Sequence, residues 1–180
     1  MIRAISTTRG KTLIREANPA DAIRFRELRL DASLNNPIAF TADHQKNLNQ
    51  PLKYWEESLS VQADESTIFL AEQEGNLIGM AGIARGDSPK TRHSAWIWGV
   101  YVKPEWRGLH LAEEIINSCF TWAKARKIVL AKLGVTAVNA SAIRCYERCG
   151  FKIYGTEPDA VFYEGKYYDE YLMVCALDIT

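Results

Sequence analysis

Residues 94–120 read SAWIWGVYVKPEWRGLHLAEEIINSCF and form the most informative stretch of the chain. The first nine residues are rich in aromatic and β-branched side chains, a composition typical of a strand, and Pro104 stops that strand. Gly99 interrupts it, which indicates a bulge or a close approach to the backbone. Beyond Arg107 and Gly108, apolar residues recur at helical spacing. The stretch therefore predicts a strand, a loop and a helix.

This strand, loop and helix predict an anion-binding site. A helix start offers free backbone N–H groups and the positive end of the helix dipole. Arg107 adds a guanidinium whose planar fork suits phosphate oxygens. The spacing is neither the dinucleotide G-x-G-x-x-G nor the phosphate-loop G-x-x-x-x-G-K-[ST], so both of those nucleotide sites are excluded.

Patterns on either side extend this unit into an α/β sandwich with a mixed sheet. Apolar runs predict further strands at 12–17, 67–72, 77–84, 128–135, 151–155 and 168–177. Asn18-Pro19, Pro51 and Asn139 predict the starts of three further helices. Residues 38–50 are polar and aperiodic, so we predict a long loop there at the rim of a substrate site.

The composition is that of a folded chain without a global charge. Of the 180 residues 47% are hydrophobic, and 22 basic side chains balance 22 acidic ones. This balance gives no reason to expect a nucleic-acid partner, and no apolar run has the length of a signal peptide or a membrane span. His44, His93 and the four cysteines lack metal-ligand spacing. We expect a single cytoplasmic domain over residues 1–180, with reduced thiols, no metal and no membrane partner.

Two segments resemble the GNAT superfamily of N-acetyltransferases, and the resemblance covers most of the chain. Residues 107–112, RGLHLA, align with the acyl-CoA signature R/Q-x-x-G-x-G/A. Residues 139–151, NASAIRCYERCGF, align with N-x-x-A-x-x-x-Y-x-x-x-G-F. One departure is His110, which stands where the family has its first glycine. A side chain there would crowd the pyrophosphate, point outward or donate to a phosphate oxygen.

The resemblance implies an α/β (α+β) fold with a GNAT-like mixed central β-sheet of about six to seven strands, flanked by about four helices. It implies an acyltransferase that uses acetyl-CoA as cosubstrate. The implied cofactor-binding residues are Val100, Tyr101, Val102, Arg107, Gly108, Leu109, His110, Leu111, Ala112 and Asn139. Asn139 is equally explained as a helix cap. We expect Glu113 and Glu114 to face away from the phosphates, which they would repel.

The resemblance also implies direct transfer of the acetyl group to a primary amine in a ternary complex. A backbone amide near Val100 would receive the carbonyl oxygen. Tyr146 resembles the family's acid, and it would stabilise the departing thiolate by a hydrogen bond at least as much as by proton transfer; the alternative is a plain core aromatic. Strand 94–102 has no carboxylate for a base, so His93 and a water relay both stay open.

The acceptor amine stays open between small molecules, a protein N-terminus and a lysine side chain. Residues 38–50, the helix with Trp55 and residues 157–166 would frame its pocket, and acidic residues there hint at a cationic acceptor. The alternative function is a non-catalytic acyl-CoA-binding or regulatory domain, which the absent strand carboxylate and His110 favour. The oligomeric state stays open as well, with a homodimer among the options.

Overall fold

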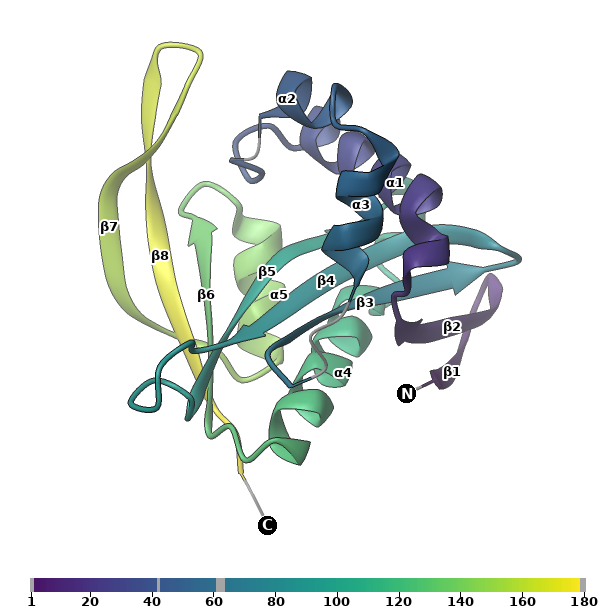
Figure 1. Cartoon of the computed structure of the whole chain (residues 1–180). Helices are drawn as coiled ribbons and strands as arrows, with labels where there is room; N and C mark the ends of the chain where they lie inside the picture. Colours follow the sequence, from purple (N-terminus) through teal and green to yellow (C-terminus); the bar gives the residue numbers. More distant parts are fainter. Residues whose placement is uncertain (1, 42, 61–63, 179–180) are drawn as a thin grey trace.

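One open sheet of eight strands forms the centre of the computed structural model, which describes residues 2–41, 43–60 and 64–178. The strands are β1 (Ile2–Thr7), β2 (Gly10–Glu16), β3 (Ser66–Gln73), β4 (Asn76–Arg85), β5 (Ser94–Val102), β6 (Leu130–Thr136), β7 (Lys152–Tyr163) and β8 (Lys166–Ala176). Their spatial order is β1-β2-β3-β4-β5-β6-β8-β7, as Figure 1 shows. Among the described strands only the pair β5 and β6 is parallel, so the predicted mixed sheet is confirmed.

Helices cover both faces of this sheet (Figure 1). On one face lie α1 (Ala22–Asn35) and α3 (Leu52–Leu59), with the short α2 (His44–Leu48) between them in the chain. On the other lie α4 (Leu111–Ala125) and α5 (Ala140–Arg148). Two 3₁₀ turns, η1 (Pro19–Asp21) and η2 (Pro104–Trp106), precede α1 and α4. None of the helices in the described ranges is long and apolar enough to cross a membrane.

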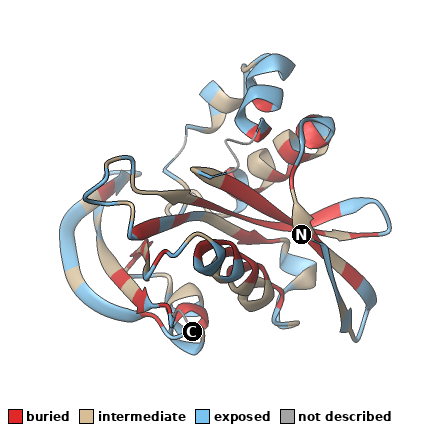
Figure 2. Ribbon diagram, turned by 60° about the horizontal axis from the view of Figure 1, so that its bottom comes forward, coloured by how far each residue is buried: buried red, intermediate tan, exposed pale blue. Residues whose placement is uncertain are grey.

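Each face has its own buried cluster, because each helix turns one apolar stripe toward the sheet. The stripe of α1 at Ala22, Phe25, Leu28 and Ala32 is buried as its spacing predicts. The corresponding stripe of α4 consists of Leu111, Ile115, Ile116, Cys119, Trp122 and Ala123. Figure 2 shows the buried residues concentrated along the middle of the sheet, while the outer part of the β7–β8 hairpin is exposed.

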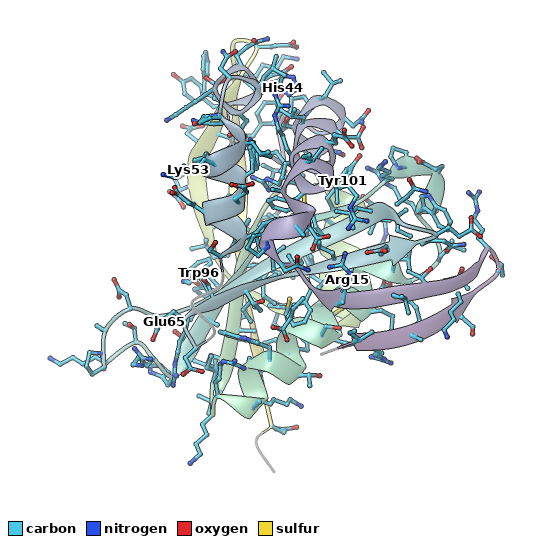
Figure 3. All side chains as sticks on the ribbon, turned by 45° about the vertical axis from the view of Figure 1, so that its right-hand side comes forward. Arg15, His44, Lys53, Glu65, Trp96 and Tyr101 are labelled. Carbon is cyan, nitrogen blue, oxygen red and sulfur yellow. The ribbon has the colours of Figure 1, made fainter. Side chains whose placement is uncertain are left out.

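A buried charged cluster fixes the start of α1 against the sheet. Arg15 on β2 donates to both carboxylate oxygens of Asp21, each at 2.7 Å, and also contacts Glu72 on β3. Asn18 completes the turn, since its backbone N–H donates to Asp21 Oδ2 at 3.0 Å. The side chain of Asp21 is 1% exposed, and Arg15 lies beside α1 in Figure 3. This cluster sets the position of α1, the helix that carries Arg29.

Two elements exceed the six to seven strands and four helices of the sequence prediction. The strand β1 is an exposed edge strand whose pattern carries no buried face. The helix α2 lies inside residues 38–50, where we predicted a loop, and no side chain of it is buried. Asp43 starts α2 by accepting a hydrogen bond from Lys46 N at 2.9 Å. Residue 42, within the same predicted loop, lies outside the described residues.

Candidate active site

A cleft opens between β5 and β6 because these strands pair only where they begin. The register runs Ser94–Leu130, Ala95–Ala131 and Trp96–Lys132 and then stops, while β6 continues its pairing with β8 through Thr136. Figure 1 shows β5 and β6 diverging from that point. The cleft has a volume of about 390 Å³, which suits a small-molecule site. Its facing walls are residues 97–102 and 133–136.

The bulge expected at Gly99 lies in one of these walls. Met80 faces Tyr101 and Gly82 faces Trp98, so Gly99 and Val100 together occupy the place of one ladder residue. Gly99 has φ +62°, a left-handed conformation that favours glycine. The bulge interrupts the ladder between β4 and β5 inside the cleft.

The start of α4 forms one end of the cleft and has the geometry of an anion site. Gly108 and His110 have φ values of +78° and +57°, which turn the chain sharply into the helix. The first N–H bonded within the turn is that of Glu114, which donates to His110 O at 3.1 Å. The N–H groups of residues 111–113 precede it and have no intrahelical acceptor. A Cβ at Gly108 would meet nothing within 4 Å, so the backbone there is open to a ligand.

His110 points outward, one of the three orientations that its sequence position left open. Its side chain is 74% exposed, and Nδ1 lies 3.1 Å from Glu113 Oε1. The same oxygen accepts from Arg148 Nη2 at 2.6 Å, so Arg148 draws Glu113 across the gap between α4 and α5. Burial alone would raise the pKa of Glu113, but these partners hold it below its usual range.

The expectation that Glu113 and Glu114 both face away is therefore half wrong. Glu114 turns to Arg3 on β1, at 2.8 Å, on the outside of the helix. Glu113 lines the cleft, because the pull of Arg148 on α5 outweighs the repulsion considered from the sequence alone.

Arg107 lies at the rim, where its guanidinium contacts the protein itself. Nε donates to Val102 O at 3.1 Å, and Nη2 lies 3.5 Å from Asn36 Oδ1. The guanidinium also stacks 5.9 Å from the ring centroid of Tyr101, which Figure 3 labels beside α1. Arg107 thus connects the loop before α4 to the end of α1. Arg144 and Arg148, which the sequence reasoning did not single out, are two further exposed cations in the cleft wall.

Tyr146 on α5 also lines the cleft, with 7% of its surface exposed. Its ring packs edge-on against Phe151 at 6.0 Å, and its hydroxyl has no hydrogen-bond partner in the described part of the chain. Burial, and then the neighbouring Cys145 and Cys149, raise the pKa of the phenol. Tyr146 therefore keeps its proton at neutral pH, and its hydroxyl can donate a hydrogen bond to a ligand.

The remaining predicted residues separate into two groups. Val100, Tyr101, Val102, Leu111 and Ala112 line the cleft together with Asn139. Asn139 is the cap of α5, since its Oδ1 accepts from Ala142 N at 3.2 Å. Leu109 packs against the core on the α4 face instead of lining the cleft.

The structure does not bring His93 to this site. It is exposed just before β5, seven residues ahead of Val100, which at about 3.3 Å per strand residue places it roughly 20 Å away. A general base must lie within hydrogen-bond reach of its proton, directly or through a water. The hypothesis of His93 as the base therefore has no geometric support.

Two charged side chains lie against glycines of the cleft walls without any signal in the sequence. Glu170 on β8 covers Gly134, whose Cβ would lie 2.7 Å from Oε2. Burial, and then Glu157, raise the pKa of this carboxyl. Arg29 on α1 covers Gly99 in the same way, with Nη1 at 2.8 Å from the place of a Cβ. Both residues occupy polar positions of their elements. The sequence pattern at these positions is the same as on any solvent-exposed face, so it does not single them out.

Comparison with known proteins agrees with this architecture. The profile of the acetyltransferase (GNAT) family matches residues 27–151. L-amino acid N-acetyltransferase AaaT of Escherichia coli is 31% identical over 125 residues, which cover 66% of this chain and 73% of that protein. An acetyltransferase of the GNAT family from Streptococcus pneumoniae superposes with a TM-score of 0.84 at 25% identity, over 93% of this chain and 99% of that one. yncA from Salmonella typhimurium, solved with its cofactor acetyl-CoA, has a TM-score of 0.76 at 23% identity, over 93% and 94% of the two chains.

The chain belongs to the acetyltransferase (GNAT) family. It is an acetyl-CoA-dependent acetyltransferase.

Proposed function

We propose that the protein transfers the acetyl group to a primary amine by direct attack, with the cleft between β5 and β6 as its active site. The observation that carries this proposal is the arrangement of the cleft, which has an open helix start at one end and the unbonded Tyr146 hydroxyl in its wall. The AaaT relative is named for L-amino acids, which supports a small-molecule amine over a protein acceptor.

The residues at the helix start are suited to coenzyme A. Its diphosphate would accept hydrogen bonds from the N–H groups of residues 111–113, where the helix dipole favours negative charge. Arg144 and Arg148 on α5 add positive charge along the same cleft. Acetyl-CoA supplies the thioester, the electrophile of the reaction.

Two groups of the chain would stabilise the charges that develop during transfer. The backbone N–H of Val100, at the bulge, would donate to the carbonyl oxygen. The Tyr146 hydroxyl would donate to the sulfur as the carbon–sulfur bond breaks and the carbon–nitrogen bond forms. The raised pKa of Tyr146 keeps this donor protonated, and because a thiol is a stronger acid than a phenol, Tyr146 would stabilise the departing thiolate by a hydrogen bond and keep its proton.

Glu170 would take the proton that the amine must lose. Its carboxylate covers Gly134, in the wall that faces Val100 across the cleft. The raised pKa brings Glu170 closer to that of an efficient base at neutral pH. A water relay between amine and carboxylate is consistent with this placement, and it replaces His93 in the scheme.

Thermal shift and turnover together test the proposal. Coenzyme A and acetyl-CoA should both raise the melting temperature. At a hundredfold excess over Kd, the free energy of unfolding should rise by about 2.7 kcal/mol. Ala112→Glu should remove this shift, because it places a carboxylate at the phosphate site while acidic residues still favour a helix start. Asn117→Glu, farther along α4, is the charge-matched control. Thiol release should then depend on an added amine, and binding without turnover on any amine would support the non-catalytic alternative.

A further inference from the structure

Arg29 holds a guanidinium for which no described residue supplies a counter-charge. Its Nη1 is sealed from solvent and has no hydrogen-bond partner among the described residues. Burial lowers the pKa of Arg29, and among the described side chains Tyr54 acts against this effect. A buried cation without a partner is costly, so such a group indicates either a missing ligand or a purely aromatic environment.

The aromatic environment is present but leaves the donors unused. The guanidinium carbon lies 5.5 Å from the ring centroid of Phe40 and 5.7 Å from that of Trp98. These rings attract a cation through their faces, yet they accept no strong hydrogen bond from its N–H groups. Phe40 and Trp98 both line the cleft, so the guanidinium lies directly behind these two wall residues.

The position of Arg29 along β5 relates it to the reacting atoms. Nη1 lies where a side chain on Gly99 would be, so this glycine is needed both for its positive φ and for the approach of the arginine. The next residue is Val100, whose amide the proposed function assigns to the carbonyl oxygen. A group bound by Arg29 is therefore close to the attacking amine.

We propose that Arg29 binds the carboxylate of the acceptor, and that the acceptor is an α-amino acid. The inference rests on the proposed function and names its substrate class. The planar guanidinium matches a carboxylate with two parallel hydrogen bonds. In an α-amino acid the amine and the carboxylate are attached to the same carbon. The two groups are therefore as close together as Arg29 at Gly99 and the proposed amide of Val100 require. A polyamine or a lysine side chain offers no anion at this distance, so the acidic residues that hinted at a cationic acceptor do not decide the specificity.

Matched acceptors test this assignment, because an L-amino acid and its amide share the α-amine and differ in the anion. For wild type we expect kcat/KM for the acids to exceed that for the amides by about thirtyfold, within the range of a hydrogen-bonded charge pair. Arg29→Gln should lower kcat/KM for the acids by about the same factor and leave the amides nearly unchanged, with an unaltered KM for acetyl-CoA. Arg29→Lys should recover part of the preference, because it keeps the charge and loses the fork.

Arg3→Gln is the control, since it removes the same charge from a half-buried pair with Glu114 on α4, outside the cleft. Its ratio of acid to amide should equal that of wild type. Equal turnover of acids and amides by wild type, or an equal loss on both in Arg29→Gln, overturns the inference and leaves the acetyltransferase proposal intact. Should Arg29→Gln fail to fold, the wild-type ratio and Arg29→Lys still decide. Absence of turnover with every amine overturns both proposals.

Discussion

Replacing Tyr146 with phenylalanine isolates the hydroxyl that we assign to the departing sulfur. The hydroxyl has no partner in the described part of the protein, so Tyr146→Phe removes a donor without leaving a buried acceptor unpaired. The edge-on contact with Phe151 at 6.0 Å involves only the ring and should persist. We therefore expect a change in the free energy of unfolding below about 0.5 kcal/mol.

The catalytic loss should be much larger than the change in stability. A hydrogen bond to a charged acceptor contributes about 1.5 to 3 kcal/mol, and each 1.36 kcal/mol is tenfold in rate, so kcat should fall by roughly ten- to 150-fold. The assay is thiol release at saturating acetyl-CoA, with coenzyme A binding measured in parallel by thermal shift. Ser141→Ala, which alters another cleft-lining hydroxyl on α5, is the control. A kcat within about twofold of wild type, with binding intact, would refute the role of Tyr146.

Three further substitutions test the stability of the fold and the identity of the general base. Gly82→Ala places a Cβ 2.2 Å from the ring of Trp98, so urea unfolding should show a loss of about 1 to 3 kcal/mol unless that ring leaves the sheet. Asp21→Asn leaves the Arg15 guanidinium without its main partner and should cost about 3 to 5 kcal/mol by the same method. Burial would raise the pKa of Asp21, but Arg15 lowers it, so wild type should lose this stability only as the pH falls below about 4, and Asp21→Asn should have a flatter acid limb. Glu170→Gln should lower kcat/KM and abolish the fall in rate as the pH drops through the raised pKa of Glu170, whereas an unchanged pH profile would exclude it as the base.

Local patterns predict the parts of this fold that depend on neighbouring residues. The cap at Asn18 starts the 3₁₀ turn η1 that leads into α1, the stripe from Ala22 to Ala32 defines α1 itself, and the glycine in strand 94–102 marks the bulge. The motif at 107–112 likewise predicts the open helix start, because a helix start has free N–H groups in any protein. Edge and surface elements escape such reasoning: β1 and α2 bury no apolar face that a periodicity could report.

The acceptor side of the site was not predictable in this way. A helical stripe reports which side of α1 meets the core, but it does not report which polar residue beside the stripe meets another strand. Arg29 approaches Gly99 and Glu170 approaches Gly134 through contacts between distant parts of the chain. Hence the residues proposed to bind coenzyme A came from short motifs, whereas the groups proposed to select and deprotonate the acceptor required the three-dimensional arrangement.

The short pairing of β5 with β6 divides the sheet into two parts. Hydrogen bonds along Ser94, Ala95 and Trp96 link the part formed by β1 to β5 with the part formed by β6, β8 and β7. Because so few hydrogen bonds join the two parts, we expect the sheet to open locally along this line. Amide hydrogen exchange should therefore be faster there than within either part. A ligand bound between the two parts would hold them together. The rigidity of the sheet should therefore rise with the occupancy of the cleft.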